Sequence, residues 1–522
     1  MGTTMDVTTA KLRGKSRNAE LKLGKLAFLI GGLFSLSGAN AAEWQIKPTI
    51  DLTETYSDNL RLAVKGKEES AFITQVSPGI DINTKGPRLQ LQANYVLQKS
   101  FYAGDQHDTR TNNLLRTNGK LAVIDELFYV DARANITQQN LTPFGRVADA
   151  NFNLIDERAE VRTWGISPSL RKNFQNQYTG EVRYVRDSVS SDAQRNADSQ
   201  SDLFRLSLTS GTAFTFFEWG GNYSKQNIHY ERQAALETQT VTSNLGFRVT
   251  PLFKLTTTAG YEKSSYASLG AKPEGFFWTA GFTWTPTERT NFTATAGHRF
   301  FGSTYSLALS QRARTSVWSL GYNEDVTTTR GQFSLPATGN TQSFLDQLWQ
   351  SIIPDKDARK QVVDNFIRDA GLPLSLAQPI NTFTNQVFLQ KNLQASVALT
   401  GVQNTAVLNL YNNTRDVLSR GGLESSVNPG LSSNVKQVGI NALWNLKFSP
   451  RTNATMNVAY TRNNSVNSNV KDFNKTFRAS ITRQLQPISR VTLEFRHVTK
   501  DSNLTVGNYD ENAVTLYLLL SL

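Results

Sequence analysis

The chain of 522 residues contains no cysteine, only three methionines and only four histidines. The absence of cysteine excludes disulfide bonds, thiolate metal sites and a cysteine nucleophile. Beyond the first 41 residues no run approaches 18 consecutive apolar side chains, so no helical membrane span is predicted. Apolar residues make up 39% of the chain, too few for a helical membrane protein, and aromatic residues make up 10%, too many for a disordered chain.

The sequence signatures of enzymes and cofactor sites are absent as well. There is no glycine-rich phosphate loop, no histidine-rich metal spacing and no serine nucleophile elbow. No particular serine pairs with any of the four histidines, which are His107, His229, His298 and His497. Basic residues are scattered and form no stripe, so nucleic-acid binding is not predicted. We therefore predict a protein that is not an enzyme and has no catalytic residue, cofactor or metal.

The N-terminal segment has the signature of an exported protein. Its basic residues are followed by an apolar run from Leu26 to Leu36 and then by Ala39-Asn40-Ala41. This order of basic, apolar and small regions predicts a cleaved signal peptide over residues 1–41; the alternative is an amphipathic or buried helix. Removing the segment lowers the net charge from +12 to +8, so much of the basicity belongs to the signal peptide. The mature chain is then residues 42–522.

From Trp44 to the end of the chain, apolar side chains recur at every second position, which is the period of a two-faced β-strand. Clear runs lie at 44–52, 276–284, 438–448 and 514–522. Short turns alternate with long polar connections near 57–70, 141–158, 188–200, 265–274 and 417–432. We count about 22 strands, and an even number returns the last strand to the side where the first begins.

Two features of these runs favour a membrane barrel over a soluble sandwich or a β-helix. They are roughly 10–14 residues long, which suits a tilted strand that crosses a bilayer and exceeds the usual strand of a sandwich. Aromatic residues gather at the run ends, as at a membrane interface: Trp44, Tyr56, Phe101, Tyr102, Phe300, Phe301 and Tyr305. Because a sheet in hydrocarbon must pair all its backbone groups, it has to close on itself. The sequence therefore predicts an all-β, antiparallel outer-membrane β-barrel.

The polar face of the runs is expected to line the lumen of this barrel. Candidate lumen-facing residues are Lys47, Asp51, Arg133, Arg183, Arg248, Lys254, Lys447 and Arg496. Further charged positions on this face are Arg478, Asp81, Asp131, Glu181, Glu262 and Glu494. Basic residues are in slight excess, which favours anionic solutes or acidic sugars; the alternative is a lumen whose charges pair with one another.

Residues 336–383 break the alternation and follow helical spacing instead. Pro354 separates two short amphipathic patterns, and Asp357 is the expected cap of the second helix. Candidate lid or plug residues are Phe344, Leu348, Trp349, Val363 and Phe366. We predict a small helical insertion in one long loop, which either closes the lumen or forms a self-packed surface cap without a gating role.

Distinctive stretches run through most of the mature chain. Among them are Tyr56-Ser57-Asp58-Asn59-Leu60, Phe282-Thr283-Trp284-Thr285-Pro286, Gly297-His298-Arg299-Phe300-Phe301-Gly302 and Asn323-Glu324-Asp325-Val326-Thr327-Thr328-Thr329-Arg330. Together they resemble the PEP-CTERM system-associated outer-membrane protein family, which accompanies exosortase and exopolysaccharide loci in Gram-negative bacteria. The resemblance implies a barrel that acts in production or export of an extracellular polysaccharide, or in sorting PEP-CTERM proteins to the surface. It implies no functional residues.

We therefore expect a barrel that serves as a passage or gated pore in exopolysaccharide export. The alternatives are a general diffusion porin and a structural or adhesive surface barrel that transports nothing. The first strand-like run begins right after the predicted cleavage site, which argues against a siderophore-type transporter whose barrel is filled by an N-terminal domain. Expected partners are outer-membrane lipid and lipopolysaccharide, a polysaccharide substrate, periplasmic exopolysaccharide-export proteins and the barrel assembly machinery.

Overall fold

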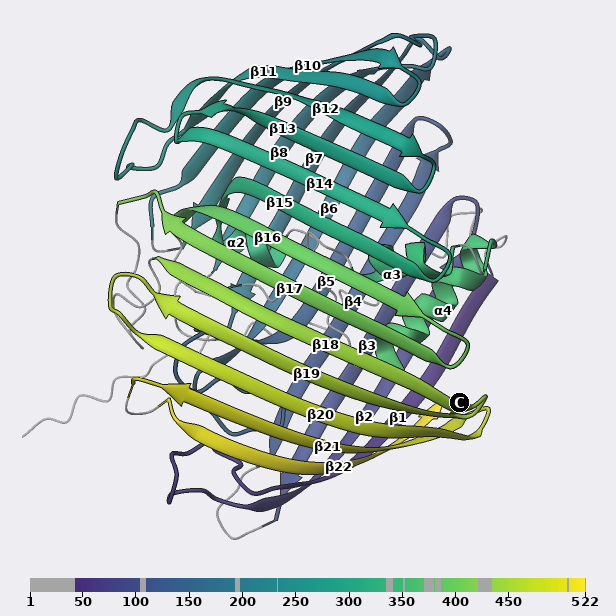
Figure 1. The fold of residues 1–522 in the computed structure, drawn as a ribbon, viewed down its shortest axis with the longest axis vertical. Helices are drawn as coiled ribbons and strands as arrows, with labels where there is room; N and C mark the ends of the chain where they lie inside the picture. Colours follow the sequence, from purple (N-terminus) through teal and green to yellow (C-terminus); the bar gives the residue numbers. More distant parts are fainter. Residues whose placement is uncertain are drawn as a thin grey trace, which may run out of the picture.

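The computed structural model describes residues 43–103, 109–192, 198–231, 233–334, 341–350, 353–369, 380, 386–420, 434–504 and 507–521. The predicted signal peptide over residues 1–41 and His107 lie outside these residues. The strands form one antiparallel sheet of 22 strands that closes on itself (Figure 1). The prediction of an all-β antiparallel barrel of about 22 strands is confirmed.

Each strand pairs with its neighbours along the chain, and the first also pairs with the last. The strands are β1 (Glu43–Ser57), β2 (Ala71–Lys85), β3 (Leu89–Tyr102), β4 (Arg110–Ile124), β5 (Phe128–Asn140), β6 (Arg158–Phe174), β7 (Tyr178–Ser191), β8 (Ser199–Ser210), β9 (Phe217–Tyr230), β10 (Leu236–Thr250), β11 (Phe253–Ser264), β12 (Glu274–Thr287), β13 (Thr290–Arg299), β14 (Gly302–Arg312), β15 (Ser316–Thr328), β16 (Val387–Thr400), β17 (Asn404–Val417), β18 (Val435–Ser449), β19 (Thr452–Ser465), β20 (Lys471–Gln486), β21 (Ser489–Ser502) and β22 (Tyr509–Ser521).

The two ends of the barrel differ in the length of their connections. One end, here called the turn end, carries the start of β1, the end of β22 and short connections that include 86–88, 251–252 and 450–451. The opposite end, here called the loop end, carries longer connections that include 141–157 and 329–386. In bacterial outer-membrane barrels the short turns face the periplasm and the long loops face outward.

Among the described residues, the helices lie in the connection between β15 and β16. They are α2 (Thr329–Ser334), α3 (Thr341–Trp349) and α4 (Lys356–Asp369). The sequence predicted two helices within an insertion over residues 336–383, so α2, which precedes that insertion, is an addition to the prediction. Within the described ranges, no helix is long and apolar enough to cross a membrane.

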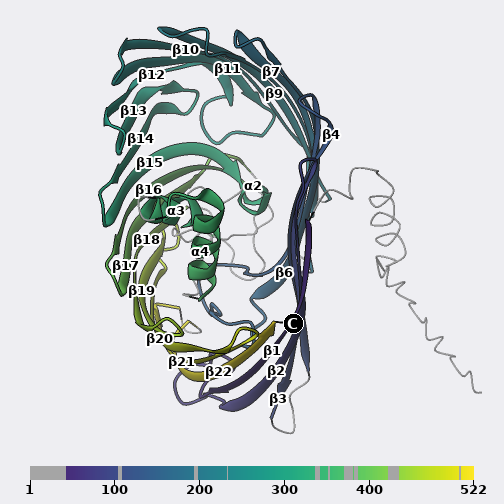
Figure 2. The ribbon, with the colours of Figure 1, turned by 90° about the vertical axis from the view of Figure 1, so that its right-hand side faces the viewer.

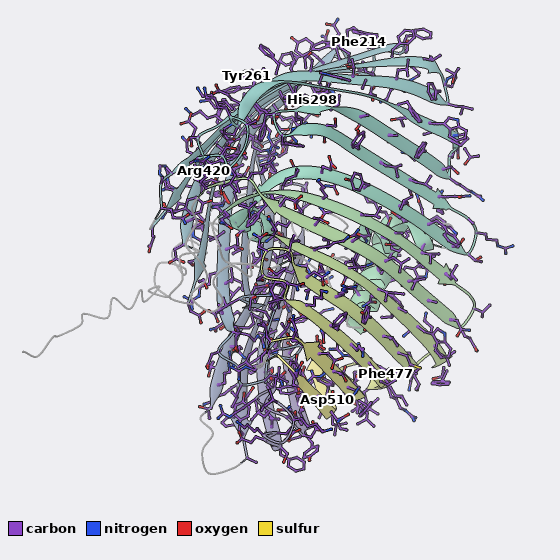
Figure 3. All side chains as sticks on the ribbon, turned by 60° about the vertical axis from the view of Figure 1, so that its left-hand side comes forward. Phe214, Tyr261, His298, Arg420, Phe477 and Asp510 are labelled. Carbon is purple, nitrogen blue, oxygen red and sulfur yellow. The ribbon has the colours of Figure 1, made fainter. Side chains whose placement is uncertain are left out.

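The register of the strands gives the barrel two chemically different faces. On the outer face, Leu255, Phe282, Ala294 and Leu307 stand next to one another across β11–β14. One position along, Thr256, Gly281, Thr295 and Ser306 form the matching row on the inner face. The large exposed apolar side chains of the strands belong to the outer set, and Tyr261 and Phe477, labelled in Figure 3, are on this face. Such a belt of apolar side chains is the surface that lipid covers.

The wall turns sharply through the strands around β10–β13 (Figure 2). Inward-facing glycines occupy this bend, where neighbouring strands leave no room for a side chain. A Cβ at Gly260 would lie 2.2 Å from the carbonyl oxygen of Val241, and one at Gly297 would lie 2.0 Å from that of Trp278. Glycine at these positions therefore permits the close approach of strands that the bend requires.

We expect an arginine on the outer face to destabilise the barrel far more than an arginine one position away on the inner face. Leu245 faces outward near the middle of β10, and its neighbour Asn244 faces inward. Leu245→Arg should lower the free energy of unfolding in lipid vesicles by about 2–4 kcal/mol, because its charge would sit in hydrocarbon. Asn244→Arg should lower it by less than about 1 kcal/mol, because its charge reaches lumenal water. Equal losses for the two variants would contradict the assignment of the faces.

Candidate functional site

The lumen is the candidate functional site, because the inner face carries the charged groups of the strands. The register places all eight candidate lumen-facing residues on this face: Lys47, Asp51, Arg133, Arg183, Arg248, Lys254, Lys447 and Arg496. They do not form one cluster. Arg248 and Lys254 lie opposite each other on β10 and β11, whereas Lys47 and Lys447 are exposed near the turn end.

Many of these charges are paired across neighbouring strands. Arg248 and Lys254 both contact Glu218, each at 2.9 Å. In another part of the wall, Arg496 of β21 lies 3.0 Å from Glu511 of β22. At these positions the lumenal charges pair with one another, so the wall is not a uniformly basic surface here.

The helices lie inside the barrel, as Figure 2 shows in a view along the lumen. Four apolar residues of α3 (Phe344, Leu345, Leu348, Trp349) and Val363 of α4 form one buried cluster with inward-facing residues of the wall. The wall residues of this cluster are Val317, Ala398, Val407 and Leu443, from β15–β18 near the turn end. The insertion therefore starts at the loop end and reaches down the lumen to the turn end.

The five candidate lid or plug residues come together in this cluster. Phe344, Leu348, Trp349 and Val363 are buried, and Phe366 packs at its edge with its ring 5.1 Å from that of Trp349. A cap that packs only on itself at the surface does not describe this arrangement, because the apolar residues contact the barrel wall. We call the pair α3 and α4 the lumenal hairpin.

Polar contacts fix the two helices of the lumenal hairpin to each other. Arg359 of α4 is buried and contacts Asp346 of α3 at 2.7 Å, while its Nη1 donates to the carbonyl of Ile353 at 2.8 Å. Asp355 caps α4, since its side chain accepts from the backbone N–H of Ala358 at 2.7 Å. The sequence had indicated Asp357 as the cap, which is wrong by two residues because the helix begins earlier than the apolar pattern suggested.

Near the loop end, the connection 141–157 also folds into the lumen. Phe152 is buried with Leu60 and Ile73, and the Tyr102 hydroxyl donates to the carbonyl oxygen of Phe152 at 2.9 Å. Phe144 is fully buried against residues of the opposite wall, including Val435. Sequence reasoning treated this segment only as a long polar loop. The signal that could have revealed it was its content of large apolar residues, which a solvent-exposed loop has no reason to carry.

An ion pair and a hydrogen bond attach this segment, here called the lumenal loop, to the far wall. Asp149 contacts Arg478 at 2.8 Å. Asp472 accepts from the backbone N–H of Gly145 at 3.0 Å and lies 3.2 Å from Lys500. The lumenal loop thus spans from β5 and β6 to β20 and β21 and crosses the lumen.

The environment of Asp149 favours its charged form. The surrounding protein disfavours the carboxylate, but the guanidinium groups of Arg478 and Arg496 outweigh this and hold the pKa of Asp149 below its ordinary value. The side chain still reaches lumenal water, with 38% of its surface accessible. The lumenal loop is therefore held by a charge that persists at neutral pH.

A third contact crosses the lumen at α2. Arg330 is buried and donates to the Asp187 carboxylate at 2.9 Å and to the Asp187 carbonyl oxygen at 2.8 Å. Asp187 belongs to β7, whereas α2 follows β15, so this contact joins two distant parts of the wall. The Arg330 contact fixes the start of the insertion inside the barrel.

Cavities lie between these inward segments and the wall. One, of about 840 Å³, lies between α4 and the wall of β2–β8. A second, of about 730 Å³, is lined by residues of β6–β11 near the turn end, and a third, of about 440 Å³, lies beneath the lumenal loop. In the described part of the chain no group of three or more His, Asp or Glu residues is placed to hold a metal ion.

Comparison with known proteins gives the fold but no family. No protein-family model and no curated protein matches this chain. Among solved structures, the FrpB iron transporter from Neisseria meningitidis (F5-1 variant) is similar at a TM-score of 0.50 and 9% identity, over 91% of this chain and 82% of that chain. The siderophore receptor PirA from Pseudomonas aeruginosa gives 0.45 and 11%, over 92% and 80%. OccK2 (OpdF) from Pseudomonas aeruginosa gives 0.36 and 9%, over 92% and 98%. The chain has the β-barrel fold found in Gram-negative outer-membrane proteins.

Removing the charge of Asp149 should loosen the lumenal loop. In Asp149→Asn we expect hydrogen exchange over residues 143–153 to rise about three- to ten-fold, because a partly solvated ion pair contributes modest stability. In the parent chain the contribution of Asp149 should be complete above its ordinary pKa of 3.8 and vanish as the pH falls through its lowered pKa in the folded state.

The matched control is Asp156→Asn, which removes an exposed carboxylate of the same loop. Its exchange rates should match those of the parent chain. An equal rise in both variants would contradict the role of the contact between Asp149 and Arg478.

Proposed function

We propose that this protein is an outer-membrane passage for exopolysaccharide export, and that the lumenal hairpin gates it. The observation that carries the proposal is the position of the hairpin: it fills one side of the lumen near the turn end and leaves a polar cavity on the other side. A permanently open channel has no need of such a segment, and a purely structural barrel has no need of the polar space beside it.

The anchoring of the lumenal hairpin suits a movable element. In the described part of the chain, its buried apolar contact with the wall involves four wall residues, from β15–β18. Ser310 and Arg312 of β14 add hydrogen bonds to the side chains of Gln347 and Gln350. Both ends of the insertion join strand ends at the loop end, so the hairpin can leave the wall without breaking any pairing of the sheet. A contact of this size is stable enough to close a passage and weak enough for a bound ligand to displace.

The lining of the lumen supports a sugar polymer as the cargo. The third cavity is lined by hydroxyl and amide side chains that include Thr53, Thr55, Gln75, Asn457 and Thr492. Such groups can replace water around sugar hydroxyls as the polymer moves. The resemblance to proteins of exopolysaccharide loci supports the same cargo, with periplasmic exopolysaccharide-export proteins at the turn end and lipopolysaccharide around the loop end.

Removal of the hairpin should open the passage. A variant lacking residues 338–380 should show a several-fold higher single-channel conductance in planar bilayers than the parent chain. Leu345→Asp/Leu348→Asp should also raise the conductance, because two buried carboxylates would cost several kcal/mol and detach α3 from the wall. Unchanged conductance in both variants, with intact barrels by heat-modified gel mobility, would contradict the gate.

Deletion of the gene should reduce secreted polysaccharide and leave the intracellular precursor to accumulate. Restoring the parent chain should restore secretion, and a variant with the hairpin tethered to the wall should not. Normal secretion in the deletion strain, together with high conductance of the purified barrel, would favour a general diffusion porin instead. Normal secretion without conductance would favour a structural barrel.

A further inference from the structure

The cavity between α4 and the wall of β2–β8 is strongly basic. Its volume is about 840 Å³ and it lies near the turn end, beside the lumenal hairpin. Its lining includes six basic side chains and one acidic side chain: Lys85, Lys120, Arg133, Arg183, Lys356 and Lys360, with Asp131. The basic residues come from four strands of the wall and from α4, so they surround the space from both sides.

The carboxylates around the cavity are already engaged by guanidinium groups. Arg183 contacts Asp131 at 2.7 Å and Glu181 at 2.6 Å. Asp187 lies 4.0 Å from Arg133 but contacts Arg330 at 2.9 Å. These three acids therefore balance the three arginines.

Three of the lysines, Lys120, Lys356 and Lys360, add positive charge beyond this balance. Among the described residues, no carboxylate oxygen lies within 4.0 Å of the Nζ atom of Lys120, Lys356 or Lys360. Lys356 and Lys360 are four residues apart on α4 and thus share a face of the helix, which is the face that lines the cavity. The space between helix and wall consequently carries a net positive charge.

Neutral polar groups stand between these charges. Gln90, Gln92, Asn118 and Ser167 line the same cavity, and their amide and hydroxyl groups can donate to and accept from sugar hydroxyls. The volume falls within the range of about 300–1,000 Å³ that is usual for ligand sites. The cavity can therefore hold a short saccharide segment together with its charges.

We infer that this cavity binds a carboxylate-bearing saccharide segment, a run of uronate residues, and makes the passage selective for acidic polysaccharide. The inference rests on the proposed function for its role in export and adds the class of polymer. Arg133, which lies 4.0 Å from an Asp187 carboxylate already bound by Arg330, offers a planar guanidinium group that matches a carboxylate. Lys120, Lys356 and Lys360 distribute positive charge along the segment.

The lumenal hairpin is part of this site, which links binding to gating. Two of the six basic groups are on α4, so the complete site exists only while the hairpin lies in the lumen. An acidic polymer that enters from the turn end meets the site before it passes the hairpin. Recognition of the polymer and closure of the passage therefore involve the same helix.

The test is direct binding to the purified full-length barrel in detergent, measured by calorimetry at fixed ionic strength. The probes are trigalacturonate, the neutral trisaccharide maltotriose and inorganic sulfate. Lys356→Gln/Lys360→Gln should weaken trigalacturonate binding about ten-fold or more, because two charges are lost from one side of the site. Glutamine has a helix propensity close to that of lysine, so α4 should remain folded.

The matched control is Lys47→Gln/Lys447→Gln, which removes two lumenal charges outside the cavity. We expect it to bind trigalacturonate as the parent chain does, and we expect maltotriose to bind neither. Equal weakening in the two double variants would show a diffuse effect of charge and overturn the site. Sulfate binding as tight as that of trigalacturonate, or no binding of trigalacturonate, would overturn the preference for an acidic saccharide.

A second measurement separates this inference from the proposed function. If trigalacturonate binds the parent chain and Lys356→Gln/Lys360→Gln weakens that binding, the saccharide site is supported even where gene deletion leaves secretion normal. If deletion abolishes secretion but trigalacturonate does not bind, export stands and the acidic class of polymer is wrong.

Discussion

The structure depends on one constraint: backbone N–H and C=O groups that face hydrocarbon must find all their partners within the sheet. The pairing of β1 with β22 satisfies it, because it joins the two strands that would otherwise be edges. Once the cylinder is closed, the side-chain period of two assigns every residue to lipid or lumen. The alternation of apolar and polar residues along the sequence is the direct result.

Closure also leaves a wide lumen, because a ring of 22 strands encloses more space than its own side chains can fill. Connections that fold inward occupy part of this space and carry the larger buried apolar clusters. These clusters are small and separate, unlike the single core of a soluble domain. The wall is held by the continuous ladder of hydrogen bonds, whereas the contents of the lumen are held by a few local contacts. The wall and the contents of the lumen are thus held by contacts of different kind and extent.

The sequence was sufficient for the parts of the fold that follow from local periodicity. Counting alternate residues is enough to find the 22 strands and their connections. It also places Lys47, Arg133 and Arg496 on the inner face. The helical spacing of Phe344, Leu348 and Trp349 was equally readable, but not the surface they contact, because that surface comes from strands far away along the chain. The lumenal loop and the basic cavity were missed for the same reason: Asp149 and Arg478, or Lys356 and Arg133, meet only after the barrel has closed.

The lumenal loop and the lumenal hairpin lie at different depths and are attached by different forces. The first is attached to β20 and β21 by the ion pair of Asp149 with Arg478 and by hydrogen bonds, and it also buries Phe144 and Phe152. The second is attached mainly by apolar contact with β15–β18. Added salt weakens the partly exposed pair of Asp149 and Arg478 and leaves the apolar contact of the hairpin almost unaffected. A rise in ionic strength therefore loosens part of the attachment of the lumenal loop while the lumenal hairpin stays on the wall, so the two segments can be released independently.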